Sequence, residues 1–292
     1  MPKSKYSKYV VTELKTPNFP PEFVTAYKQF ATRILWMDSN VVPGAFQMNC
    51  SWYLKPNAHG AEAHQHDVDE IIGFFGNDSK NPYDLHGEIE FWLEDKQFIF
   101  NKTTMIFVPA GMKHCPLIIR RVVKPIFHYS TVTGGKYIQQ KTEVKSGTPR
   151  LKLDKYVVTE LKMPEEKRRI NNDYIKYATR ILWLDKDVVP GAFHMNTAWF
   201  WKAGPTLEDK PHTHENDEII GFFGNDSSRP NDLGAEVEFW IEGERQLITK
   251  SAMLFIPAGL VHCPMVLRRV DRPIFHFTVV PAPRYIKDEK EK

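Results

Sequence analysis

A long internal repeat is the feature that most constrains how this chain can fold. The decapeptide DEIIGFFGND at residues 69–78 returns unchanged at residues 217–226, 148 positions later. Shorter blocks such as ATRILW and PIFH also occur twice, at nearly the same offset. Units of about 145 residues are too long for solenoid repeats, and each can form a core of its own. The sequence therefore predicts two similar domains from an internal duplication, at residues 1–147 and 148–292.

Short runs rich in Val, Ile, Phe and Trp indicate strands in each half. In GEIEFWLE at residues 87–94, Ile89, Phe91 and Leu93 share one face, which is the period of a half-buried strand. Turn-forming clusters separate such runs, with GNDSKNPYD in the first half and GNDSSRPND in the second. Helical spacing is weaker, although PEFVTAYKQF and NNDYIKYATR can each hold a short helix. We therefore expect an all-β fold, with an antiparallel sandwich or barrel in each half.

Residues of the types that bind metals recur at fixed spacing in both halves. The first half contains His64, His66 and Glu70 in the pattern H-x-H-x-x-x-E, and His114 ends the pattern P-x-G-x-x-H. Residues two apart on a strand share a face, so both histidines of the first motif point the same way and Glu70 has the parity to join them. The second half carries the same residue types at the same internal spacing: His212, His214, Glu218 and His262.

These residues allow two interpretations. A pair of histidines on a strand is most often a surface feature or a hydrogen-bonded part of the core. Recurrence of all four ligand types in both halves instead favours a metal site in at least one half. Three neutral imidazoles and one carboxylate suit a divalent transition metal, namely Fe, Mn, Ni, Co, Cu or Zn. We therefore expect such a metal as cofactor, with up to two ions per chain.

On these two motifs the chain resembles the cupin superfamily, and with both halves it looks like a bicupin. The first motif is followed by a glycine, Gly76 or Gly224, and the resemblance covers nearly all of both halves. It implies two tandem antiparallel jelly-roll (cupin) β-barrels, each with a metal inside. It also implies that the four ligand-type residues of each half form one metal shell.

Other residues in the repeated blocks have a functional and a structural interpretation. His128 and His276, in PIFH, can be proton shuttles or partners of a metal ligand, or else hydrogen-bonded core histidines. Arg33 and Arg180, in ATRILW, can bind a substrate carboxylate through paired hydrogen bonds, or else form an ordinary ion pair. All four are candidate catalytic residues. Because residues beside the ligands differ between the halves, one site can be catalytic and the other structural.

The cysteines give information about compartment and about the metal sites. Cys50, Cys115 and Cys263 are too few for a disulfide framework and indicate a reducing compartment. Cys115 and Cys263 directly follow His114 and His262. Strand alternation should turn both side chains away from the metal, so we expect buried thiols and not ligands.

Composition and charge exclude several classes of protein. Lys and Arg number 39 against 36 Asp and Glu, and a net charge of +3 spread along the chain is no argument for nucleic acid or an anionic membrane. The N-terminus lacks the apolar segment of a signal peptide, and no apolar run approaches the roughly 20 residues of a membrane helix. We therefore expect a cytoplasmic protein without nucleic-acid or membrane partners. Pairing of edge strands between subunits would make it a homodimer.

The resemblance also implies a function. Paired domains with complete ligand sets look like the double-domain dioxygenases and oxalate decarboxylases. We therefore expect dioxygenase-like oxygenation, or decarboxylation, of a small carboxylated or aromatic molecule. A metal-dependent isomerase is the alternative among enzymes, because a divalent ion stabilises developing negative charge in that reaction too. A non-catalytic bicupin that binds a metal or a ligand is the alternative outside them.

Overall fold

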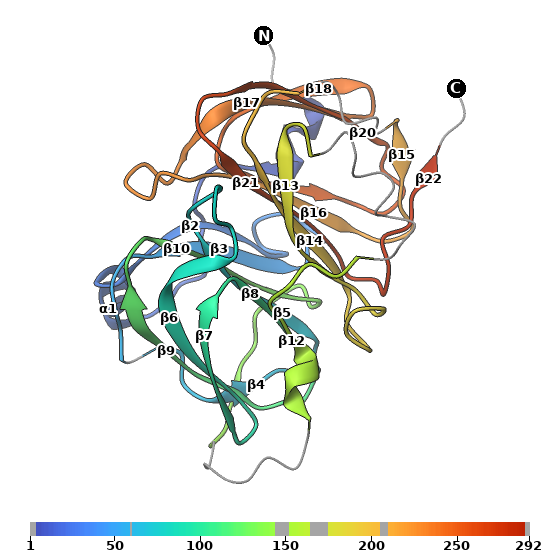
Figure 1. Ribbon diagram of the computed structural model, residues 1–292. Coiled ribbons are helices and arrows are strands. Elements are labelled where there is room, and N and C mark those ends of the chain that lie inside the picture. The colour runs from blue at the N-terminus through green and yellow to red at the C-terminus, as the bar shows by residue number, and fades with distance from the viewer. Residues whose placement is uncertain (1–3, 59, 144–151, 164–174, 205–209, 290–292) are drawn as a thin grey trace. The chain divides into compact units, whose positions relative to one another are not determined.

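The structure, a computed structural model, describes residues 4–58, 60–143, 152–163, 175–204 and 210–289. In these residues strands dominate, and the paired strands run antiparallel (Figure 1). The expected all-β fold is thereby confirmed.

Helical structure is confined to short segments among the described residues. The helix expected within residues 21–30 forms as α1 (Pro21–Lys28). Proline has no backbone N–H group, and the first residue of a helix does not need one because its N–H has no partner within the helix. The helix expected within residues 171–180 is not formed in its described part, where a turn leads directly into a strand. Two short 3₁₀ helices complete the described helical residues: η1 (Lys5–Tyr9) and η2 (Leu153–Tyr156).

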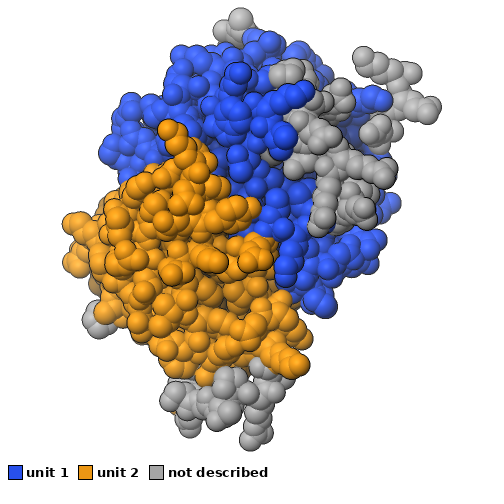
Figure 2. Space-filling view, in the orientation of Figure 1, with its two compact units in different colours: residues 1–14, 42–45, 161–292 blue, residues 15–41, 46–160 orange. Residues whose placement is uncertain are grey.

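Contacts divide the chain into two compact units (Figure 2). Unit 2 comprises residues 15–41 and 46–160, and unit 1 comprises residues 1–14, 42–45 and 161–292. Each unit therefore consists mainly of one copy of the repeat, together with short segments of the other. Division of the chain into two domains at the boundary between the repeats stays a prediction.

Unit 2 contains two antiparallel sheets that follow from the strand pattern of the first half (Figure 1). Its strands are β2 (Ala31–Met37), β3 (Gln47–Tyr53), β4 (His64–Gln65), β5 (Glu70–Gly76), β6 (Asp84–Leu93), β7 (Lys96–Lys102), β8 (Thr104–Val108), β9 (His114–Val122), β10 (Ile126–Val132), β11 (Gln140–Lys141) and β12 (Val157–Val158). The sheet orders are β12-β8-β5-β10-β3-β2 and β11-β4-β9-β6-β7.

Unit 1 repeats this arrangement with the strands of the second half and with β1 from the first half. Its strands are β1 (Val10–Val11), β13 (Ala178–Leu184), β14 (His194–Phe200), β15 (His212–Thr213), β16 (Glu218–Gly224), β17 (Asp232–Ile241), β18 (Glu244–Lys250), β19 (Ala252–Ile256), β20 (His262–Val270), β21 (Ile274–Val280) and β22 (Asp288–Glu289). The sheet orders are β1-β19-β16-β21-β14-β13 and β18-β17-β20-β15-β22. The matching orders confirm that the repeat encodes the same fold twice.

The hydrophobic core of unit 2 takes side chains from both of its sheets. Ile89, Phe91 and Leu93 of β6 belong to one cluster with Ile72 and Phe74 of β5, and none is more than 5% exposed. The three residues of β6 are those that period-two alternation assigned to one face, so that prediction is confirmed. Apolar burial of this kind is the main force that holds two sheets together.

The two copies of YVVTEL pair with strands of the opposite repeat copy. Val10 of β1 lies opposite Leu254 of β19 in unit 1, and Val157 of β12 lies opposite Ile106 of β8 in unit 2. Each short strand therefore extends the six-stranded sheet of a unit that consists mostly of the other copy.

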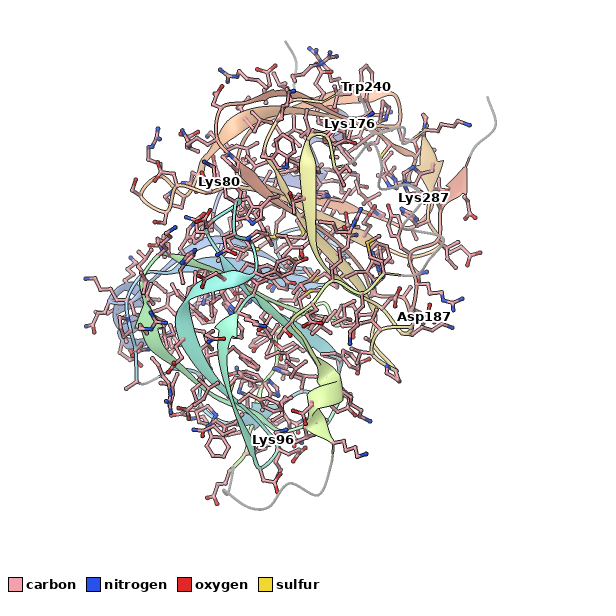
Figure 3. The ribbon with its side chains drawn as sticks, in the orientation of Figure 1. Lys80, Lys96, Lys176, Asp187, Trp240 and Lys287 are labelled. Atoms are coloured by element: carbon pink, nitrogen blue, oxygen red, sulfur yellow. The ribbon has the colours of Figure 1, made fainter. Side chains whose placement is uncertain are left out.

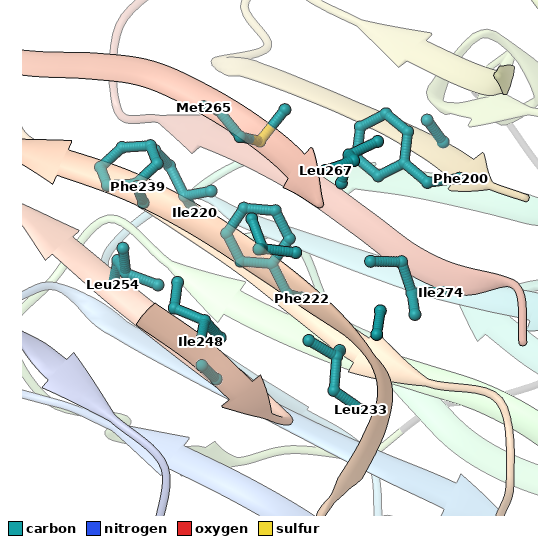
Figure 4. Close-up of a cluster of buried hydrophobic side chains, with 14 of the residues drawn as sticks. Phe200, Ile220, Phe222, Leu233, Phe239, Ile248, Leu254, Met265, Leu267 and Ile274 are labelled. Atoms are coloured by element: carbon teal, nitrogen blue, oxygen red, sulfur yellow. The ribbon is translucent and has the colours of Figure 1, made fainter. Parts of the chain in front are cut away.

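Phe222 of β16 tests how far packing stabilises unit 1. The residue is fully buried among apolar side chains such as Ile220 and Leu254 (Figure 4). Replacing Phe222 with Ala should lower the free energy of unfolding by about 3–5 kcal/mol, because apolar burial is lost and a cavity remains. The control is Ile175→Ala, since Ile175 is 58% exposed; this change should stay within about 0.5 kcal/mol. Chemical denaturation measures both, and equal losses would contradict the prediction.

Candidate metal centres

The four expected ligand residues of the first half come together in unit 2. His64 begins β4, Glu70 begins β5 and His114 begins β9. The pairing of β4 with β9 places His64 opposite His114, and His66 follows β4 directly. One donor atom from each of the four residues lies within 4.8 Å of the others, and all four side chains are buried. This group, here called the first centre, could hold a metal ion.

The atoms that face one another in the first centre lack other partners. Glu70 Oε2 lies 3.3 Å from His66 Nε2 and 3.0 Å from His114 Nε2. Within the described residues, these three atoms are buried and have no well-aligned hydrogen-bond partner. A buried polar atom without a partner costs about 1–3 kcal/mol, so three together call for a further group. A divalent cation fits, because it accepts lone pairs from all three atoms.

The opposite ring nitrogens orient the three imidazoles. Each Nδ1 lies within hydrogen-bond distance of a backbone carbonyl oxygen, and the pairs are His64 with Glu62, His66 with Ile138 and His114 with Met112. A carbonyl only accepts, so each Nδ1 carries the hydrogen and each Nε2 presents a lone pair. This is the tautomer in which histidine binds a metal through Nε2.

Burial and proximity set the protonation states in the first centre. Burial, together with the neighbouring His114, lowers the pKa of His64 to about 4. Burial by itself would raise the pKa of Glu70, but the adjacent side chains of His114 and His66 hold that pKa well below its usual range. At neutral pH His64 is therefore neutral and Glu70 is ionised, which are the forms that bind a cation.

The second half forms an equivalent group in unit 1, here called the second centre. Glu218 Oε2 lies 3.4 Å from His214 Nε2 and 3.0 Å from His262 Nε2, and His212 lies opposite His262 in the pairing of β15 with β20. In the described part of the chain, all three Nε2 atoms and both carboxylate oxygens are buried without a hydrogen-bond partner. The Nδ1 atoms again meet backbone carbonyls: His212 with Lys210, His214 with Ile286 and His262 with Leu260.

The second centre differs from the first in how its donor atoms are grouped. His214, Glu218 and His262 form one close group, and His212, His262 and Cys263 form another. The prediction that alternation turns Cys263 away from the ligands is therefore wrong. Its φ of 73° lies in the left-handed region, which breaks the alternation of β20 at this residue. The expected burial of the thiols is confirmed.

His128 and His276 have the surroundings of hydrogen-bonded core histidines. The His128 ring stacks between Tyr53 and Phe74, at centroid distances of 4.7 and 5.1 Å. Its Nδ1 donates to the carbonyl of Gly73 at 3.0 Å, and His276 makes the same bond to the matching glycine. Burial lowers the pKa of His128 to about 4, so its ring is neutral at neutral pH. A catalytic role for either residue stays a prediction.

The buried His128 should make the stability of the folded chain depend on pH. Its pKa is about 4 when folded and about 6.5 when unfolded. Between these values the unfolded state binds more protons, so the contribution is present above about pH 6.5 and is lost as the pH falls toward 4. His128→Phe, which keeps an aromatic ring, should flatten this part of the profile by on the order of 3 kcal/mol. Thermal midpoints across this range test it, and parallel profiles would contradict it.

Arg33 and Arg180 occupy matching positions on β2 and β13 but have different surroundings. The guanidinium of Arg33 lies 4.6 Å from the ring centre of Tyr27 and 5.3 Å from that of Trp36. Arg180 donates from Nη1 to Asn196 Oδ1 at 2.8 Å. A role for both arginines in binding a substrate carboxylate stays a prediction.

Two tyrosines that were not expected from the sequence lie beside the centres. The Tyr137 ring lies 4.7 Å from the His66 ring, and the Tyr285 ring lies 4.8 Å from the His214 ring. Each tyrosine follows the histidine of PIFH by nine residues, so the repeat itself carried the signal.

The position two residues after each tyrosine gives the two centres different charges. Gln139 lies beside His64, with 3.1 Å between the two Nε2 atoms. The matching residue of the second half is Lys287, which precedes β22 (Figure 3). Burial, then His262 and then Lys287 lower the pKa of His212 to about 4. The first centre thus has a neutral amide where the second has a cation.

Comparisons with known proteins identify solved structures with a similar fold. No protein family matches the sequence, and no curated protein matches it either. Among solved structures, AerE from Microcystis aeruginosa is similar with a TM-score of 0.51 and 14% identity, over 91% of this chain and 95% of that chain. A mutant of the oxalate decarboxylase OxdC from Bacillus subtilis reaches a TM-score of 0.54 at 10% identity, over 95% and 81%. A structure of that decarboxylase concerned with its Mn(II) centres gives 0.51 at 12%, over 89% and 74%.

The fold is therefore similar to that of AerE and of the oxalate decarboxylase, and the duplicated motifs resemble those of the cupin superfamily. The expected antiparallel all-β fold of each half is confirmed; in the described residues each unit has two facing antiparallel sheets and not one closed ring of strands. At identities of 10 to 14% the likenesses show the fold alone. Among the described helices, none has the length and apolar character needed to cross a membrane.

Proposed function

We propose that the protein is a metal-dependent bicupin enzyme that oxygenates or decarboxylates a small carboxylated or aromatic molecule. One observation carries the proposal: buried imidazole nitrogens and a carboxylate oxygen converge without hydrogen-bond partners in both units, within the described residues. Buried, unpaired and mutually close donor atoms are expected at a metal site and costly elsewhere. One structural neighbour is an oxalate decarboxylase, which agrees with this class of reaction.

The donor sets indicate which ions each centre would hold. The proposed ligands are the three histidines and one glutamate of each centre: His64, His66, Glu70 and His114, and His212, His214, Glu218 and His262. Mn is our first choice among the suitable metals, because the decarboxylase neighbour is described with Mn(II) centres. When bound, a divalent ion supplies positive charge that stabilises negative charge developing on a substrate oxygen.

The residues of the chain would prepare the first centre for this chemistry. Ser130 donates to Glu70 Oε1 at 2.5 Å, which leaves Oε2 directed at the histidines. The Tyr137 ring lies against His66 and would limit the access of water on that side. Arg33 would bind a carboxylate of the substrate through its fixed pair of donors.

The test of this proposal joins metal analysis to a substrate panel. Purified, metal-replete protein is first analysed for its elements and then assayed with small carboxylic and aromatic acids, with and without oxygen. Oxygen uptake supports oxygenation, and release of carbon dioxide without oxygen uptake supports decarboxylation. Zinc or nickel in the centres, with an aldose–ketose conversion, would point to the isomerase instead. Protein that holds no metal after reconstitution would contradict the proposal.

We also propose that the protein is a homodimer. β7 and β18 lie at the edges of their five-stranded sheets, and they expose Ile99 and Leu247. Exposed apolar residues on an edge strand favour pairing with another strand. Light scattering at micromolar concentration tests this, and a monomer would count against it.

A further inference from the structure

Gln47 is a buried amide that its surroundings leave unpaired. It begins β3 and is 0% exposed, yet within the described residues neither Nε2 nor Oε1 has a hydrogen-bond partner. An amide buried in this way loses its hydrogen bonds to water and gains nothing in return. A residue of this kind in the interior of a domain calls for a missing partner.

The strand register places Gln47 on the same face as the first centre. Gln47 lies opposite Val132 of β10, and Val132 lies opposite Glu70 of β5. Residues directly opposite one another in antiparallel strands point to the same side of the sheet. Two strand spacings separate the backbones of Gln47 and Glu70, which is roughly 9–10 Å. A small molecule that lies over Val132 can therefore reach both the amide and the centre.

A second unpaired donor lies further along the same face. Trp36 stands opposite Asn49, the next inward-facing residue of β3, and the Arg33 guanidinium lies 5.3 Å from the Trp36 ring centre. Arg33 Nε is buried without a hydrogen-bond partner among the described residues. Tyr137 connects this surface to the first centre, since its ring lies 6.4 Å from that of Trp36.

The matching residues of the second half bond to one another. His194, the counterpart of Gln47, has its Nε2 3.1 Å from Asn196 Nδ2. Asn196 Oδ1 in turn accepts from Arg180, the counterpart of Arg33, at 2.8 Å. His194 Nε2 and Arg180 Nη1 thus each have a side-chain partner, whereas neither polar atom of the Gln47 amide has one among the described residues.

We propose that Gln47 is a substrate-recognition residue of the first centre, and that the second centre lacks this function. The inference rests on the proposed function, since it assumes a metal in each centre. The ligand class is a small carboxylate with a second oxygen on the adjacent carbon. One oxygen accepts from Gln47 Nε2 while the other reaches the metal, and a hydroxyl group or water donates to Oε1.

Proteins that retain a single centre make the comparison direct. His212→Ala/His214→Ala leaves the first centre, and His64→Ala/His66→Ala leaves the second. Each is loaded with Mn(II) and titrated with oxalate as the probe, while the electron paramagnetic resonance signal of the ion is followed. We expect oxalate to bind the first centre at least tenfold more tightly, and acetate, which lacks the second oxygen, to show a smaller difference. Equal oxalate affinities would overturn the inference.

Gln47→Leu in the protein that retains the first centre isolates the amide. The change removes both unpaired polar atoms and keeps a side chain of similar length, so the thermal midpoint should hold or rise. Oxalate affinity should fall about tenfold with Mn(II) content unchanged, whereas Gln97→Leu, at an exposed amide on β7, should leave affinity unchanged. A lowered midpoint with unchanged oxalate affinity would show that Gln47 is structural and overturn the inference.

Mn(II) uptake tests the metal-dependent function, and oxalate affinity tests the role of Gln47. If neither single-centre protein takes up Mn(II), the proposed metal-dependent function is wrong. If both take up Mn(II) and oxalate does not distinguish them, or does not respond to Gln47→Leu, only the role of Gln47 is wrong.

Discussion

Replacing His64 with Ala should reduce the metal content of the replete protein from two ions per chain to one. The Nε2 atoms of His64, His66 and His114 belong to one buried group with Glu70, so the loss of one removes a quarter of the proposed ligands. Changes beside metal ligands already cost 10–100-fold in affinity, and loss of a ligand itself should cost more. Elemental analysis after dialysis into metal-free buffer measures the number of ions per chain.

Two further variants give this experiment its controls. His212→Ala should empty the second centre alone, because His212 lies in unit 1. Gln65→Ala alters the residue between two proposed ligands, but the Gln65 amide bonds to Gln140 on the opposite face and not to the centre. It should keep two ions. Loss of both ions from His64→Ala, or of neither, would contradict two independent centres.

The ligand positions could be predicted because they depend on local geometry. His64 and His66 are two residues apart, and any extended backbone puts such residues on one face. Glu70 kept the same parity and begins the next strand. His114 lies 44 residues further on, and only the antiparallel pairing of β4 with β9 brings it opposite His64. Its recurrence in the second half, rather than its position, was the evidence in the sequence.

The exchange of β1 and β12 could not be predicted from the sequence. Both strands belong to the same hexapeptide, YVVTEL, and their partners β8 and β19 are also copies of each other. Local pairing energies are therefore nearly equal for either choice. Which copy pairs with which depends on the path of the whole chain, and a repeat contains no information about that path.

The residues that surround the centres could not be predicted from the sequence, for a different reason. Cys263 was expected to point away because alternation was assumed, and its left-handed backbone breaks that assumption. Tyr137 recurs in the second half as Tyr285, but it comes from a segment after β10 that has no strand pattern, so recurrence alone did not indicate contact with His66. Gln47 is an ordinary polar residue of a strand in the sequence, and only burial without a partner sets it apart.

Glu70→Gln and Glu218→Gln should each empty one centre while they preserve the volume of the side chain. Each glutamate is the only anion of its proposed ligand set, and its ionised form is held by neighbouring histidines, so that its pKa is lowered in spite of burial. Glutamine keeps an oxygen donor but removes the charge that offsets the ion's +2. The metal should therefore bind less tightly by more than the 10–100-fold typical of changes beside a ligand.

The same two variants should separate catalysis from stability. A bound metal stabilises the folded state by about 2.7 kcal/mol at a hundredfold excess over its dissociation constant, so each variant should lower the thermal midpoint of metal-replete protein. If substrate binds only at the first centre, where the Gln47 amide is available to it, Glu70→Gln should abolish turnover and Glu218→Gln should mainly reduce stability. Glu88→Gln is the control, because Glu88 faces Arg120 at 3.7 Å in a partly exposed pair, worth about 0–1 kcal/mol. Full metal occupancy and unchanged midpoints in both variants would show that neither glutamate is a ligand.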